Sequence, residues 1–455
     1  MSIKSVHITN YYHKTSGGIS TSYNKLLEAA DRRRRSVRLI VPGEINSVED
    51  VGEFGRIYYV KANFSPVFDK RYRLMLPWNT YLFDDAPIKA ILREEKPDII
   101  EIGEKYTLSL MAGLLRKHVI HTSQKRPILV HLSCERMDDN VGSFIGKGHL
   151  SEWFTRRYIA NFVLPMFDFH LANSEYTAQE FRDAVSAMKD PHRSNRFFNY
   201  CWRLLRAPQV ALNERIFVNQ CGVDNVTFTP SRRSAGARRA IEQKHGLLAE
   251  AKLVLYAGRI SPEKNVGLLA DAMKELVKDG KRDYYLLVAG SGPAEETLRL
   301  QAERAAPGRV KMLGHIGDKG ELADLFANCD AFIHPNPREP FGITPLEAMA
   351  SGLPLVAPDS GGVLSYANDT NAWITKPNGE SFAAAVRDIF ADAGRREEKV
   401  QNALETSGRY TWDASTDSTF ALYDQMYATF QADEGLYDYS DSPDEIDFAG
   451  VLTAC

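Results

Sequence analysis

Short apolar runs that alternate with helix-like segments constrain the fold of this chain more than any other feature. In the first half of the chain they occupy residues 5–9, 37–41, 98–102, 128–132 and 169–172. In the second half they occupy residues 252–257, 284–289, 310–313, 331–334 and 354–357. Strands separated by helical segments are typical of parallel βαβ units. The sequence therefore predicts an α/β protein with two doubly wound sheets of one type.

The chain length indicates how these runs divide into domains. A chain of 455 residues fits two domains of ordinary size. We expect Rossmann-like domains over 1–225 and 226–408, joined by a basic, apolar-poor linker around 224–240. A helix with an aromatic stripe is expected over 409–432, packing back toward the amino-terminal domain. Residues 433–455 are acidic and poorly patterned, so we expect a flexible tail.

Composition narrows the class of protein. With 44% hydrophobic and 25% charged residues, the chain is typical of a soluble globular protein. A net charge of -3 gives no general attraction to polyanions, so nucleic acid is not an expected partner. The five cysteines form no C-x-x-C pair, which argues against a disulfide framework or a zinc site. No signal peptide or spanning apolar run is recognisable, so we expect a cytoplasmic protein that contacts a membrane at its surface at most.

One segment, 182–215, is longer than a simple βα connection needs. It holds seven basic and three acidic residues, interleaved with Phe197, Phe198, Tyr200 and Trp202. A solvated helical hairpin is the simpler interpretation of this insertion. The alternative is a docking surface for an acceptor or a membrane.

Residues that follow the apolar runs are the candidates for ligand binding, because ligands of open α/β sheets bind beyond the carboxyl ends of strands. Gly17 and Gly18 follow the first run, where they form either an ordinary turn or an anion site at a helix N-terminus. Arg259 and Lys264 follow the first run of the second series. Two cations there either bind a diphosphate or are simply solvated.

Two glutamates, Glu339 and Glu347, lie eight residues apart near the end of the second series. Thr344-Pro345-Leu346-Glu347 matches a capping box, with Thr344 as the N-cap, Pro345 at the first helical position and Glu347 reaching back to the cap amide. Glu339 precedes a proline outside that helix and has no comparable local role. Its carboxylate is therefore expected to accept hydrogen bonds from sugar hydroxyls.

The segment PREPFGITPLEAMASGLPLVAP resembles the E-x7-E segment of the retaining glycosyltransferases of family 4. Other stretches resemble further landmarks of that family, namely TSGGIS, NQCGVD, YAGRISPEKNVGLLADAM, VAGSGP and LGHIGDKGELADLFANCDAFIHP. The resemblance extends over roughly residues 5–430. It implies the GT-B fold, in which two Rossmann-like domains face a central cleft. The amino-terminal domain would select the acceptor, and the carboxy-terminal domain would bind the nucleotide sugar.

The resemblance also implies roles for individual residues. Glu339 would bind donor-sugar hydroxyls and Glu347 the ribose, while Arg259 and Lys264 would hold the diphosphate with help from the turn at Gly17 and Gly18. His131 matches a histidine near the donor sugar and the acceptor, so it joins Arg259, Lys264 and Glu339 as a catalytic candidate, although a structural histidine is the alternative. Donor contacts through the helix start, backbone amides or the base pocket are implied for Gly314, His315, Ile316, Phe341, Gly342, Ile343 and Thr344.

The activity implied is transfer of a hexose from a UDP- or GDP-linked sugar to an acceptor hydroxyl, with retention of the anomeric configuration. The acceptor, whether a sugar, a lipid-linked sugar or a small molecule, stays open, because insertion 182–215 and Val363–Tyr366 depart from the family pattern. No other cofactor is expected. Turnover without a metal is also expected, since no D-x-D pair follows a strand.

Other functions stay open at this point. A sugar-nucleotide epimerase or hydrolase of the same fold would form product without an acceptor. A non-catalytic nucleotide-sugar binding module would not need the full set of cations. A dinucleotide-dependent oxidoreductase is disfavoured, because Gly290-Ser291-Gly292 starts a dinucleotide motif that Glu295 breaks.

Overall fold

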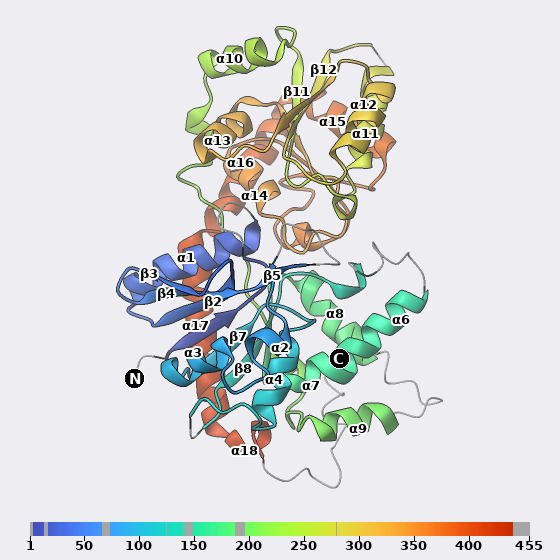
Figure 1. Ribbon diagram of the computed structural model, residues 1–455. Coiled ribbons are helices and arrows are strands. Elements are labelled where there is room, and N and C mark those ends of the chain that lie inside the picture. The colour runs from blue at the N-terminus through green and yellow to red at the C-terminus, as the bar shows by residue number, and fades with distance from the viewer. Residues whose placement is uncertain are drawn as a thin grey trace. The chain divides into compact units, whose positions relative to one another are not determined.

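The computed structural model describes residues 3–12, 17–65, 73–123, 125–139, 141, 149–186, 196–278 and 280–439. The chain forms two compact units (Figure 1). Unit 1 comprises Met1–Gln220 and Ser415–Cys455, and unit 2 comprises Cys221–Ala414. Each unit is built on its own sheet with helices on both faces, so the fold is α/β with two Rossmann-like units.

Unit 1 contains an eight-stranded sheet with the order β10-β9-β8-β7-β1-β2-β4-β3. Its neighbouring strands are parallel except for β3 and β4, which form an antiparallel hairpin. β5 and β6 form a separate antiparallel pair. The strands are β1 (Ser5–Ile8), β2 (Val37–Gly43), β3 (Ser47–Val51), β4 (Gly55–Lys61), β5 (Asn63–Phe64), β6 (Arg73–Leu74), β7 (Ile99–Ile102), β8 (Ile128–Ser133), β9 (Phe169–Ala172) and β10 (Ile216–Val218).

The helices of unit 1 cover both faces of this sheet. Helices α3, α4, α7 and α8 pack on one face, while α1, α17 and α18 pack on the other. The helices are α1 (Gly18–Arg33), α2 (Pro77–Thr80), α3 (Pro87–Glu95), α4 (Ser109–Arg116), α6 (His149–Tyr158), the π-helix η1 (Ile159–Val163), α7 (Leu164–Met166), α8 (Glu175–Ser186), α9 (Arg196–Leu204), the 3₁₀ turn η2 (Leu212–Arg215), α17 (Trp412–Ala432) and α18 (Glu434–Tyr437).

The carboxy-terminal helix α17 completes the core of unit 1. It buries a stripe of side chains, Phe420, Tyr423, Met426 and Phe430, against the sheet. The spacing of three to four residues places these side chains on one helical face. Residues 415–439 are therefore part of the fold of unit 1 rather than an appendage to unit 2.

Unit 2 contains a six-stranded parallel sheet with the order β13-β12-β11-β14-β15-β16. Its strands are β11 (Lys252–Ala257), β12 (Tyr284–Ala289), β13 (Val310–Gly314), β14 (Ala331–Ile333), β15 (Leu355–Pro358) and β16 (Trp373–Thr375). Burial of β11, β12 and β15 is nearly complete on both faces, as expected for a parallel sheet between helical layers.

Helices α11, α12 and α15 cover one face of this sheet, and α10, α13, α14 and α16 cover the other (Figure 1). The helices and 3₁₀ turns of unit 2 are η3 (Pro230–Arg232), α10 (Ala235–His245), η4 (Pro262–Lys264), α11 (Gly267–Lys278), α12 (Glu295–Ala305), α13 (Lys319–Asn328), α14 (Ile343–Ala350), η5 (Gly362–Ser365), α15 (Gly379–Ile389) and α16 (Ala393–Arg409).

The predicted apolar runs all form strands, within two residues at either end. The strands β3, β4, β10 and β16 of the two sheets, and the short pair β5 and β6, were not predicted. β3 is almost fully exposed and carries no apolar pattern, while β10 and β16 are three-residue edge strands. Such strands depend on their neighbours in the sheet more than on their own sequence.

Two segments of the structure differ in detail from their predictions. Of the insertion 182–215, residues 187–195 lie outside the described part, and the remainder forms the end of α8, α9 and η2. Of the predicted flexible tail, residues 434–437 form α18, in which Tyr437 is buried and its carbonyl accepts hydrogen bonds from Arg116 and Arg126. Residues 440–455 lie outside the described part. None of the described helices is long and apolar enough to cross a bilayer.

Candidate functional site

The loop between β14 and α14 presents Glu339 at the carboxyl edge of the sheet in unit 2. Lys264, at the end of η4, binds both oxygens of this carboxylate, with its Nζ 3.0 Å from Oε1 and 2.9 Å from Oε2. Asn336 Nδ2 donates to Oε2 at 3.0 Å, and Nε2 of His334 lies 3.7 Å from the same oxygen. The expectation that Glu339 has no local role is therefore wrong, because it is the partner of Lys264.

These contacts determine the charges of the group. Burial alone would raise the pKa of Glu339, but Lys264, His334 and Asn336 lower it to about 2. Burial lowers the pKa of His334 to about 4, so this ring is neutral at pH 7. An ammonium has three donors. Because Glu339 takes two of them, Lys264 retains one for a ligand.

Side chains and amides from three other elements hold this loop in place. Asn265 Nδ2 donates to the Pro335 carbonyl at 2.9 Å, and Ser360 Oγ donates to the Pro337 carbonyl at 3.1 Å. The Gly362 amide donates to the Glu339 carbonyl at 2.6 Å. A Cβ on Gly362 would lie 1.9 Å from the Pro340 carbonyl, so only glycine permits this approach. The conformation of Glu339 is thus determined by segments distant in sequence.

Helix α14 begins earlier than predicted. Its N-cap is Gly342, with φ of 90°, and Ile343 is its first residue. Thr344 therefore lies inside the first turn, and the predicted capping box with Glu347 does not form. The physical reason is that Gly342 adopts a left-handed conformation open to glycine, while the side chain of the preceding residue, Phe341, is buried.

Glu347 lies in the middle of α14 and is only partly exposed. Burial, reinforced by the charge of Asp224, raises its pKa to about 7, although Lys319 opposes the shift. No other described residue forms a hydrogen bond or ion pair with its carboxylate. A ligand with hydroxyl donors would therefore supply the partners that the protein does not.

The remaining predicted donor residues follow β11 and β13. Arg259 is partly exposed and lies 3.9 Å from Glu263. Gly314 ends β13 with φ of 73° and accepts a hydrogen bond from the Gly290 amide at 2.8 Å. His315 is exposed, and Ile316 packs against the core beside α13. Since β11, β13 and β14 are parallel, these residues and Glu339 share one edge of the unit 2 sheet.

The glycines of the broken dinucleotide motif have a structural role. A Cβ on Gly290 would lie 1.9 Å from the Gly258 carbonyl, and one on Gly292 would lie 2.2 Å from the Ile260 carbonyl. The Ile260 amide donates to the carbonyl of Ser291 at 3.0 Å. These glycines are required by the contact between the loops after β11 and β12, so they do not indicate NAD.

Two predicted residue sets lie in unit 1. Gly17 is the N-cap of α1, with φ of 104°, and Gly18 is the first residue of that helix. His131, on β8, is 0% exposed, and its ring lies against Phe167, Phe181 and His170. Burial and the charge of Lys105 hold its pKa well below the usual range, so the ring is neutral. This geometry favours a structural histidine, and the catalytic role stays a prediction.

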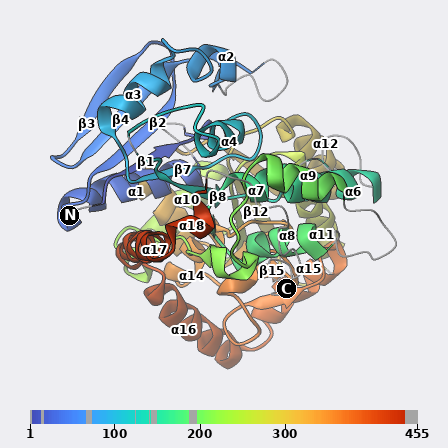
Figure 2. The same ribbon diagram turned by 90° about the horizontal axis from the view of Figure 1, so that it is seen from below.

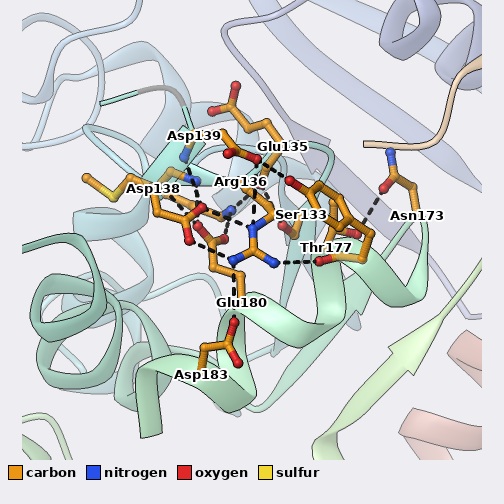
Figure 3. Close-up of polar contacts among 12 residues, drawn as sticks. Ser133, Glu135, Arg136, Asp138, Asp139, Asn173, Thr177, Glu180 and Asp183 are labelled. Carbon is orange, nitrogen blue, oxygen red and sulfur yellow. Dashed lines mark hydrogen bonds and ion pairs between the residues drawn. The ribbon is translucent and has the colours of Figure 1, made fainter. Parts of the chain in front are cut away.

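Sequence reasoning missed a polar cluster at the carboxyl ends of β8 and β9 (Figure 3). Arg136 pairs with Asp138 at 2.6 Å and with Asp183 at 3.4 Å, and it donates to the Tyr176 carbonyl at 3.1 Å. Glu180 accepts from the amides of 137 and 138. The only sequence signal was the charged stretch SCERMDD directly after the fourth predicted strand.

This cluster fastens the loop after β8 to helix α8. Buried Lys105 pairs with buried Glu180 at 2.5 Å, which closes the cluster from the side of β7. Glu135 lies at the edge of the cluster and accepts a hydrogen bond from the Tyr11 hydroxyl at 3.0 Å. The cluster therefore positions Glu135 at the carboxyl edge of the unit 1 sheet. No group of three or more metal-ligating side chains occurs in the described part of the chain.

Comparison with known proteins shows a similarity to one family over part of the chain. Residues 237–406, which hold Arg259, Lys264 and both glutamates, match the family model described as glycosyl transferases group 1. Over these residues the chain is similar to the group 1 glycosyltransferases. The match covers most of unit 2, and thus the edge of the sheet at which the predicted donor residues meet.

Relatives of known name extend the match to unit 1. The chain is 25% identical over 92% of its length to a GDP-mannose-dependent alpha-(1-6)-phosphatidylinositol dimannoside mannosyltransferase of Mycobacterium tuberculosis, 96% of which is covered. It is 24% identical over 91% of its length to a GDP-mannose-dependent alpha-mannosyltransferase of Corynebacterium glutamicum, 87% of which is covered.

Solved structures share the fold. Sucrose-phosphate synthase from Thermosynechococcus elongatus superposes with a TM-score of 0.68 at 18% identity, covering 94% of this chain and 100% of that one. Anabaena Alr3699/HepE in complex with UDP superposes with a TM-score of 0.63 at 19% identity, covering 93% and 100%. The chain therefore shares the GT-B fold along nearly its whole length.

Proposed function

We propose that this glycosyltransferase moves a hexose from a nucleotide diphosphate sugar to an acceptor hydroxyl with retention of the anomeric configuration, and that unit 2 binds the donor. The observation that carries the proposal is the pair of Lys264 and Glu339 at the carboxyl edge of the unit 2 sheet. It sets an ionised carboxylate, which accepts from sugar hydroxyls, directly beside a cation suited to a phosphate.

The roles of the residues in this transfer follow from the place where negative charge develops in the transition state. As the bond from the anomeric carbon to the diphosphate breaks, the leaving diphosphate gains negative charge. Lys264 and Arg259 stabilise that charge, together with the positive end of α14, whose N-terminus at Gly342 carries no side-chain cap. Glu339 orients the hexose through its hydroxyls. Glu347 accepts hydrogen bonds from the ribose.

The relatives support GDP as the nucleotide and mannose as the hexose, because two of them carry GDP-mannose-dependent names over nine-tenths of this chain. The test is calorimetric titration with GDP, UDP, ADP and NAD, followed by incubation with GDP-mannose and candidate acceptors. We expect GDP to bind most tightly. Tightest binding of UDP would overturn the base assignment, and tightest binding of NAD would overturn the whole proposal.

Retention and transfer are tested by the product. A retaining hydrolase needs two carboxyl groups about 5 Å apart around the anomeric carbon. We therefore expect GDP release to depend on an acceptor, and NMR of the product to show the α-configuration of the donor. Equal release without acceptor would favour a hydrolase or epimerase instead. We also infer that turnover needs no metal, so EDTA should leave the rate unchanged, and activity restored only by Mn²⁺ would contradict this.

A further inference from the structure

Helix α9 of unit 1 packs against the π-helix η1, which continues α6, although about thirty residues separate η1 from α9 in the sequence (Figure 2). The Trp202 indole of α9 donates to the Ala160 carbonyl of η1 at 2.8 Å. Phe198, Cys201 and Trp202 form the buried face of α9. Thr155 of α6 and Ile159 of η1 are also buried. The opposite faces of α6, η1 and α9 point outward, and we call them together the α6–α9 surface.

The α6–α9 surface is apolar. Two of its side chains, Leu150 at 82% and Tyr200 at 61%, are among the most exposed large side chains of the described chain. The other exposed apolar side chains of this surface are Trp153, Phe154, Phe162, Phe197 and Leu204. Contiguous exposed apolar side chains are rare on monomeric soluble proteins and mark interaction sites.

A ladder of aromatic rings connects the two helices. Phe154 stacks on Tyr158 with ring centroids 6.4 Å apart, and Tyr158 contacts Phe162 at 5.7 Å. Phe162 then meets Phe197 of α9 edge-on at 6.1 Å. The exposed rings therefore form one continuous patch rather than separate side chains.

The charges of the surface are mostly positive. The described residues of α6 and α9 include four arginines, Arg156, Arg157, Arg196 and Arg203, and a single acidic residue, Glu152. The guanidinium of Arg157 lies over the Trp153 ring, 4.8 Å from its centroid. This local excess contrasts with the net charge of -3 for the whole chain.

We propose that the α6–α9 surface docks unit 1 onto an anionic lipid bilayer. Aromatic rings prefer the level of the lipid headgroups, where their apolar bodies are buried and their polar atoms stay hydrated. Arginines beside them meet anionic headgroups. A second copy of the chain fits the surface less well, because a twofold contact would bring the same arginines on both copies together.

The experiment is co-sedimentation of the full chain with vesicles of phosphatidylcholine alone and of phosphatidylcholine with phosphatidylglycerol. We expect binding to the anionic vesicles and much weaker binding to the neutral ones. Replacing Arg196 and Arg203 by glutamine should lower the partition coefficient by about fivefold per arginine. Phe197→Ser with Tyr200→Ser should lower it by about tenfold or more.

Matched variants exclude a general effect of the substitutions. Arg239→Gln and Leu248→Ser change exposed residues of unit 2 and should leave binding unchanged. Thermal melts of all variants show whether folding is intact. As an independent readout, lipids with brominated acyl chains should quench tryptophan fluorescence in the wild type, and the quenching should fall in Trp153→Phe.

The proposal is overturned by equal binding to neutral and anionic vesicles, by no binding to either, or by α6–α9 variants that bind like the wild type. It is also overturned if these variants instead convert a dimer into a monomer in analytical ultracentrifugation. That result would identify the surface as a contact between copies of the chain.

Discussion

At the scale of single residues, the ion pair between Lys264 and Glu339 changes the roles expected for these two side chains. Both side chains are partly or largely buried, with exposed fractions of 30% and 13%. Lys264 therefore holds Glu339 in place, and the function proposed above gives it a second role at the diphosphate. The guanidinium of Arg259 lies 3.9 Å from the carboxylate of Glu263, a longer contact than that between Lys264 and Glu339.

Substitution should separate these two cations. Lys264→Ala and Arg259→Ala should each lower kcat/KM by on the order of 10², because each removes a donor aimed at developing charge. Only Lys264→Ala should also lower the melting temperature, because it leaves Glu339 buried without its cation. Steady-state kinetics and ligand-free thermal melts test this division. An equal loss of stability in both variants would contradict it.

The pKa of Glu339 predicts how unit 2 responds to acid. Because folding lowers this pKa to about 2, the ionised carboxylate stabilises the fold at pH above about 4.5, and the stabilisation is lost as pH falls toward 2. The shift corresponds to about 3 kcal/mol. Denaturant unfolding should show Glu339→Gln less stable than wild type at pH 7, with the difference shrinking below pH 4.5. A difference that does not depend on pH would contradict this assignment.

Glu347 should behave in the opposite way. Its pKa of about 7 means that ionisation opposes folding increasingly as pH rises from about 4.5 through 7. Glu347→Gln should therefore be neutral at pH 4.5 and stabilise the ligand-free protein by about 1–2 kcal/mol at pH 8, after allowance for partial exposure. Loss of stability in this variant at pH 8 would contradict this prediction and would support the capping role that the structure does not show. Affinity for GDP, in contrast, should fall in the variant.

At the scale of elements, the loop that carries Glu339 depends on the glycine turn after β15. Gly361 is the N-cap of η5 and Gly362 is its first residue, and the Gly362 amide and Ser360 hydroxyl both donate to carbonyls of this loop. The two elements lie side by side because no side chain separates them. The glycines thus act on the site by fixing the loop that carries Glu339.

Gly362→Ala should disrupt this contact. The added methyl group would overlap the Pro340 carbonyl, so the loop must move and Glu339 with it. We expect kcat to fall by on the order of tenfold or more, together with a lower melting temperature. Gly408→Ala is the matched control, because nothing lies within 4 Å of a Cβ at this helical position. That variant should keep its activity and gain about 0.5–1 kcal/mol. Normal kinetics in Gly362→Ala would contradict the role of this turn.

At the scale of the whole molecule, the chain returns to unit 1 after completing unit 2. The Tyr423 hydroxyl of α17 donates to Glu101 of β7, across 322 residues of sequence. Glu101 also accepts from Tyr23 and pairs with His7. Burial would raise the pKa of Glu101, but these partners lower it below its usual range. Unit 1 therefore needs the last part of the chain to satisfy a buried charge.

Tyr423→Phe tests whether the hydrogen bond from α17 to Glu101 stabilises unit 1. It removes one donor from a buried carboxylate, so unit 1 should lose about 1–3 kcal/mol of unfolding free energy. Tyr427→Phe, on the same helix, is the control and should change little. Hydrogen exchange of β1 and β7 should increase only in the first variant. Equal stability of both variants would show that α17 is held by apolar packing alone.

The sequence by itself determined most strands of both sheets, because burial between two helical layers requires apolar runs that are visible locally. It also singled out Arg259, Lys264, Glu339 and Glu347, since residues at the carboxyl ends of parallel strands share one edge. The start of α14 was missed by two residues, because glycine at 342 prefers a conformation that a capping box does not reveal.

Only the tertiary structure decided which groups meet. Lys264 and Glu339 are 75 residues apart, the glycines at 290 and 292 pack against the loop after β11, and the rings of α6 continue onto α9. Such contacts depend on where separate elements come to lie, and neither periodicity nor local propensity contains that information. Burial acts in the same way. It made His131 neutral and gave the two glutamates opposite pKa shifts, although the same side chain stands at both positions.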